Sequence, residues 1–103
     1  MSKTPNWLAL ARLKRGLLRE FRSEGVVRVE WVIAFTEPFD FWVWLGTTTD
    51  AEREELASLD TLEDRIRRRA ERRHLAPLFE GVSVESQETV DREYEGSWFY
   101  RLR

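Results

Sequence analysis

Residues 31–45 constrain the fold most, because they place six aromatic side chains on two strand-like runs around Pro38. In the second run, apolar residues alternate along the strand while Trp42 and Trp44 fall on its opposite face. One face can pack on a core, but two indoles on the other face need a second cover: a helix, a partner or a ligand. The segment therefore predicts a sheet with large apolar groups on both faces.

Length and composition favour a single folded domain that spans residues 1–103. Hydrophobic residues make up 42% of the chain and aromatic residues 13%, which is typical of a globular core. Cysteine is absent, so disulfides and thiolate chemistry are excluded. The sequence shows neither a signal-peptide pattern at its start nor an apolar run long enough for a membrane span. We therefore expect a cytoplasmic protein that makes no membrane contact.

The first predicted element is a helix from about Pro5 to Glu24, capped by Thr4 and ended by Gly25. Apolar residues recur along it at spacings of three or four. They are Trp7, Leu10, Leu13, Leu17 and Phe21. Gly16 interrupts this helix, and we interpret it as a close approach of backbone to sheet.

An antiparallel hairpin is predicted next, from strands over residues 26–36 and 39–45. Its core face carries alternate apolar residues packed against the first helix. They are Val27, Val29, Trp31, Ile33, Phe35, Phe39 and Phe41. The opposite face gathers Val32, Ala34, Trp42 and Trp44 into one aromatic patch.

The second half is predicted to begin with a capping box at Thr49 and Glu52, opening a helix through about Ser58. After a break near residues 58–60, a further helical stretch runs to about Ala76 and is stopped by Pro77. Strands over residues 81–87 and 97–102 then complete the sheet, with a loop or a helical turn between them. The fold class is α+β, in the order α-β-β-α-β-β, with a four-stranded antiparallel sheet and helices mainly on one face.

The sequence offers few groups for catalysis. His74 is the only histidine, and it follows an arginine cluster, so we interpret it as a solvated residue at a helix end. No metal motif is present, and most carboxylates lie where helix caps account for them. Asp40 is interpreted as a residue at the sheet edge. We expect no enzyme, no catalytic residues, no cofactor and no bound metal.

Nucleic-acid binding is the main alternative function, carried by a helix rich in arginine. Its contact residues would be Arg65, Arg68, Arg69, Arg72 and Arg73. The formal net charge of -2 and the flanking acids weigh against it. A self-neutralising, solvated helix is the simpler interpretation.

The function predicted from sequence is non-catalytic protein–protein interaction through an aromatic sheet face, because exposed aromatic patches mark interfaces. The interaction residues would be Val32, Ala34, Trp42, Trp44, Trp98 and Tyr100. The partner is a second copy of the chain, giving a homodimer, or another protein. Two alternatives stay open: a small apolar ligand in a sheet–helix pocket, or helices on both faces that bury every tryptophan.

Overall fold

The apolar stripe of the first helix produces the expected element, α1 (Trp7–Phe21), in a computed structural model that describes residues 4–95. Its stripe is buried at Leu10, Leu13, Leu17 and Phe21, but Trp7, which was predicted to belong to it, is 56% exposed. The predicted cap at Thr4 is wrong. The side chain of Asn6 caps the helix instead, since its Oδ1 accepts the backbone N–H of Ala9 at 3.1 Å.

The end of α1 confirms the predicted role of Gly25. After α1 a short 3₁₀ turn, η1 (Arg22–Glu24), leads to Gly25, whose φ of 96° is left-handed. The backbone N–H of Gly25 donates to the carbonyl of Arg22 at 3.1 Å. A residue with a Cβ would be strained in this conformation, so the glycine sets the point where the helix stops.

The predicted antiparallel hairpin is present as β1 (Val26–Ile33) and β2 (Phe41–Thr47). Its core face differs from the prediction at three places. Phe39 is one of them, because it precedes β2, has a left-handed φ of 69° and is not among the core residues. The register shifts between Val26 and Arg28, so Val26 is buried and Val27 is exposed. Phe35 lies beyond the end of β1 and is 100% exposed, so its predicted place in the core is wrong.

Two helices join β2 to the last strand. Thr49 and Glu52 form the predicted capping box at the start of α2 (Asp50–Ala57). A break follows, and α3 (Leu62–Glu71) then ends earlier than expected, before the 3₁₀ turn η2 (Ala76–Leu78). Their core contacts are thin, as the sequence indicates. The buried residues are Leu56, Leu62, Ile66 and Ala70.

The last described strand, β3 (Phe79–Ser86), pairs with β2 in parallel, so the prediction of a wholly antiparallel sheet is wrong. The reason is the connection: α2 and α3 carry the chain back to the starting end of β2, and β3 then runs in the same direction. The following segment, predicted to be a loop or a helical turn, is the short helix α4 (Gln87–Glu93).

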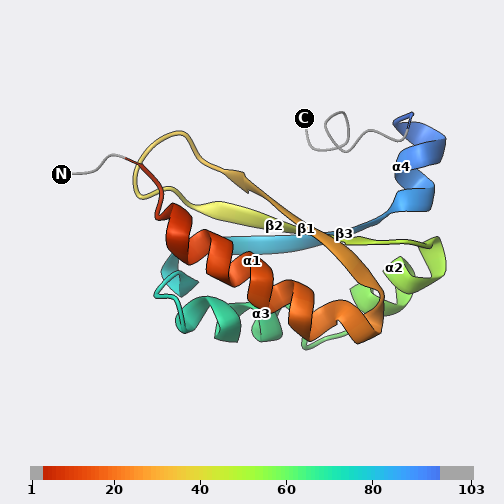
Figure 1. The fold of residues 1–103 in the computed structure, drawn as a ribbon, viewed down its shortest axis with the longest axis horizontal. Coiled ribbons are helices and arrows are strands. Elements are labelled where there is room, and N and C mark those ends of the chain that lie inside the picture. The colour runs from red at the N-terminus through yellow and green to blue at the C-terminus, as the bar shows by residue number, and fades with distance from the viewer. Residues whose placement is uncertain (1–3, 96–103) are drawn as a thin grey trace.

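The described residues form a small, mixed α+β domain with four helices and a three-stranded sheet in the order β1-β2-β3. Figure 1 shows α1 and α3 on the same side of the sheet, while α4 projects from its end. Leu56 of α2 joins the same core as the α1 stripe. The predicted fourth strand, residues 97–102, lies outside the described residues.

Candidate functional site

The side of the sheet that faces away from α1, α2 and α3 carries the predicted aromatic patch. We define the outer sheet face as Val32, Trp42, Trp44, Gly81 and Ser83. The register places Val32 opposite Trp42, and Trp42 opposite Gly81 on the next strand. Alternation along β2 buries Phe41, Val43 and Leu45 on the core side and leaves the two indoles outward.

Trp42 is held in one position on this face. Its Nε1–H donates to the hydroxyl of Ser83 at 2.8 Å. Its ring lies over Gly81, where an added Cβ would come within 2.6 Å of two ring carbons. Even so, Trp42 is 38% exposed and its neighbour Val32 is 45% exposed. A large aromatic group is thus fixed in place and accessible to a partner.

The remaining predicted interaction residues are less informative. Ala34 is exposed just past the end of β1, where its N–H donates to the carbonyl of Asp40 at 2.9 Å. Trp44 is half-buried. Trp98 and Tyr100 lie outside the described residues. Sequence reasoning missed Gly81 and Ser83, because only the parallel register of β3 brings them to Trp42.

Two of the predicted nucleic-acid contacts are instead tied to α1 by ion pairs. Arg65 Nε lies 2.9 Å from Glu20 Oε2 and Arg69 Nε lies 2.6 Å from Glu20 Oε1. Arg65 also pairs with Glu24, and its guanidinium stacks 4.2 Å from the centroid of the Phe21 ring. These contacts join α3 to α1. Arg65 is therefore part of the packing between the helices rather than a free cation.

Glu20 remains ionised at the centre of this network. Burial raises the pKa of its carboxyl, but hydrogen bonds from Arg69 and Arg65 outweigh burial, so the pKa lies below its ordinary value. The other predicted contacts, Arg68, Arg72 and Arg73, are exposed. Within residues 4–95, none of these three forms an ion pair.

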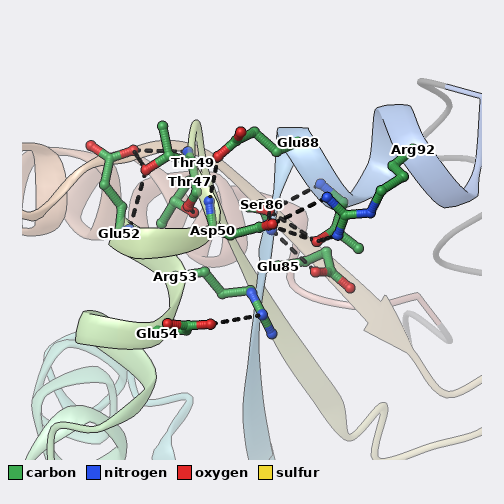
Figure 2. Close-up of polar contacts among 11 residues, drawn as sticks. Thr47, Thr49, Asp50, Glu52, Arg53, Glu54, Glu85, Ser86, Glu88 and Arg92 are labelled. Atoms are coloured by element: carbon green, nitrogen blue, oxygen red, sulfur yellow. Dashed lines mark hydrogen bonds and ion pairs between the residues drawn. The ribbon is translucent and has the colours of Figure 1, made fainter.

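A polar junction joins the start of α2 to α4 (Figure 2). The Asp50 carboxylate accepts hydrogen bonds from the hydroxyls of Ser86 and Thr89, the latter at 2.7 Å. Arg92 Nη1 lies 3.3 Å from the other oxygen of Asp50. In return, the backbone N–H of Asp50 donates to Glu88 Oε1 at 2.7 Å. The parallel pairing brings these groups together, since Thr47 and Ser86 end adjacent strands.

The chemistry of this junction suits a structural clamp. Hydrogen bonds from Ser86 and Thr89, and then from Arg92, lower the pKa of Asp50 to about 2. A carboxylate with so low a pKa is a poor general base at neutral pH. His74, the only histidine, lies past the end of α3 in a left-handed conformation with φ of 58°. Asp50 therefore fastens α4 to α2.

The clamp predicts a specific acid sensitivity. Because the folded pKa of Asp50, about 2, lies below its ordinary value of 3.8, ionised Asp50 stabilises the fold above pH 3.8. This contribution is lost as the pH falls through the folded pKa. Urea denaturation between neutral pH and pH 2 should show a smaller acid-dependent loss for Asp50→Asn than for the unchanged protein. Glu55→Gln, which removes an exposed carboxyl from the same helix, should retain the full loss; an equal reduction in both variants would contradict the clamp.

The predicted ligand pocket of Trp42, Trp44 and Tyr100 involves a residue outside the described range. A hollow of about 270 Å³ lies elsewhere, between η1 and α2. Glu24, Glu52 and Glu55 line it. Three carboxylates at one rim suit an apolar ligand poorly, because binding would remove water from charged groups.

No group of three or more His, Asp or Glu side chains within residues 4–95 is placed to hold a metal ion. No helix in that range has the length and apolar character needed to cross a bilayer. Comparison of the chain with protein-family models, with curated proteins and with solved structures gives no match. Among the described residues, the outer sheet face and the exposed arginines of the helices are the features from which we propose a function.

Proposed function

We propose that this protein is a non-catalytic interaction domain that binds a protein partner through the outer sheet face. The observation that carries the proposal is Trp42, which is accessible on a face that α1, α2 and α3 do not cover. Tryptophan is enriched at binding hot spots, where a few residues supply most of the affinity. Val32 extends the apolar contact beside it.

The fixed position of Trp42 favours binding. A side chain that is free in the unbound protein loses rotamer freedom when a partner immobilises it, and this loss lowers the affinity. The hydrogen bond to Ser83 and the contact with Gly81 restrict the indole before any partner arrives. A polar rim is also available, since Arg28 and Glu30 form an ion pair at 3.0 Å on β1.

A second copy of the chain is the partner that we propose. In a two-fold dimer the same patch meets itself, so it must be self-complementary. The apolar pair of Val32 and Trp42 satisfies this requirement directly. The rim does so as well, because Arg28 and Glu30 present one cation and one anion that can exchange partners across the axis.

Sedimentation velocity over a range of concentrations tests the dimer. We expect Trp42→Ala to raise the dissociation constant by at least about 30-fold, which corresponds to about 2 kcal/mol for a hot-spot residue. The matched control is Trp7→Ala, which removes a 56% exposed tryptophan from α1 and should leave the dissociation constant unchanged. A monomer at concentrations up to about 100 μM would exclude the homodimer. An equal effect of both substitutions would exclude the outer sheet face as its interface.

A further inference from the structure

A basic groove runs between α1 and α3, on the helical side of the domain and away from the outer sheet face. Two adjoining hollows of about 270 and 220 Å³ form it, and both are lined by Arg12 and Arg73. We define the arginine groove by its six arginines: Arg12, Arg15, Arg19, Arg69, Arg72 and Arg73. No described Asp or Glu lines either hollow.

The helical repeat builds this groove from two rows of side chains. On α1, Arg12, Arg15 and Arg19 follow spacings of three and four, beside the buried leucine stripe. On the other side, Arg69 lies close over the backbone of α1 at Gly16. A Cβ added there would come within 3.2 Å of Arg69 Nη1. Gly16 is therefore explained by a close approach of α3, and its predicted approach to the sheet is corrected.

The groove concentrates positive charge, most of which the described residues do not neutralise. Arg69 is paired with Glu20. The other five arginines form no ion pair within residues 4–95. Like charges at spacings of three or four on a helix repel one another, and a bound anion removes that repulsion. A chain with a formal net charge of -2 thus carries a localised cationic surface.

We propose that the arginine groove binds the phosphate backbone of a nucleic acid, independently of base sequence. All six cations are guanidinium groups, which bind phosphate oxygens in a bidentate manner. Arg12 and Arg19 are separated by about 10 Å along α1 at 1.5 Å per residue, a length beside which several phosphates of one strand can lie. The described lining contains no Phe, Tyr or Trp, and His74 is its one ring side chain that could stack on a base, so backbone contacts dominate.

Fluorescence anisotropy with labelled oligouridine RNA and a labelled DNA duplex, each of about 20 nucleotides per strand at about 50 mM salt, tests this proposal. The groove variant is Arg12→Gln, Arg15→Gln and Arg73→Gln together. We expect it to bind at least about 10-fold more weakly than the unchanged protein and to reduce the slope of log affinity against log salt by about 2 to 3. Glutamine keeps a helix propensity close to that of arginine, and circular dichroism confirms that each variant is folded.

The matched control removes the same number of charges away from the groove, through Arg22→Gln, Arg53→Gln and Arg67→Gln. Its affinity should stay within about 2-fold of the unchanged protein. Equal losses in both variants would show a general charge effect and overturn the groove as the site. Absence of binding at low salt would overturn the proposal outright. Competition by polyglutamate as effective as that by RNA would overturn the assignment to nucleic acid, since carboxylates would then serve as well as phosphates.

Discussion

Replacing Phe21 with alanine should lower the free energy of unfolding by about 3–5 kcal/mol, the loss typical of a fully buried phenylalanine. Phe21 is 0% exposed at the last turn of α1. Its ring packs in the core and supports the guanidinium of Arg65. The substitution therefore leaves a cavity and removes the stacking surface of a cation that joins α1 to α3. Urea denaturation at neutral pH measures the change, with an unchanged m-value showing that unfolding remains two-state.

Phe35→Ala provides the matched control, because it removes the same ring from a position that is fully exposed. Its effect should stay within about 0.5 kcal/mol, as for most surface substitutions. The comparison also tests the structure against the sequence pattern, since the alternation of β1 predicts that Phe35 lies in the core. A loss of several kcal/mol in Phe35→Ala would contradict the end of β1 at Ile33.

The second large effect is expected at Gly81. In Gly81→Ala, the new methyl group meets the ring of Trp42 at 2.6 Å, too close for any relaxed contact. The indole must move, and its hydrogen bond to Ser83 is then lost. We expect a loss of about 1–3 kcal/mol in the free energy of unfolding, the range typical of overpacking. The same urea denaturation measures it.

A double-mutant cycle assigns this loss to Trp42. In the Trp42→Ala background there is no ring to displace, so Gly81→Ala should have almost no effect. Gly16→Ala is the contrasting glycine substitution. Its Cβ comes within 3.2 Å of Arg69 Nη1, which must shift by a few tenths of an ångström beside Glu20, and alanine favours a helix over glycine by about 1 kcal/mol, so a small gain in stability is expected. A loss at Gly81 that persists without Trp42 would show a backbone cause instead.

Helix positions were predictable because their signals are local. The stripe at Leu10, Leu13 and Leu17 depends on the helical repeat alone, and the capping box of Thr49 and Glu52 is closed within four residues. The hairpin of β1 and β2 was predictable for the same reason, since a short connection forces adjacent strands to be antiparallel.

Features that depend on distant residues were not predictable. The direction of β3 depends on the end of the sheet to which α2 and α3 return the chain. The residues of Phe79–Ser86 themselves do not indicate it. The shift at Val26 is a change of one residue in register, which exchanges the core and solvent faces of the strand at that point. Alternation alone therefore assigned Val27 to the core.

The candidate surfaces show the same division. Strand alternation was sufficient to place Trp42 and Val32 on one face, but Ser83 and Gly81 join them only through the parallel pairing. The arginines of α3 and of the turn that follows it were visible in the sequence. Their separation into Arg65, which is paired, and Arg73, which lines a groove with Arg12, required the packing of α3 beside α1.

The two strand pairings of the sheet, β1 with β2 and β2 with β3, close loops of very different length. Ile33 and Phe41 pair across 8 residues of sequence, whereas Phe41 and Phe79 pair across 38. For a flexible chain, the longer closure loses about 1.4 kcal/mol more in conformational entropy. The segment between β2 and β3 contains α2 and α3, whose helical structure shortens the flexible path that has to be closed. Topology therefore favours a hairpin that forms from local contacts, with β3 joining the sheet through the longer closure.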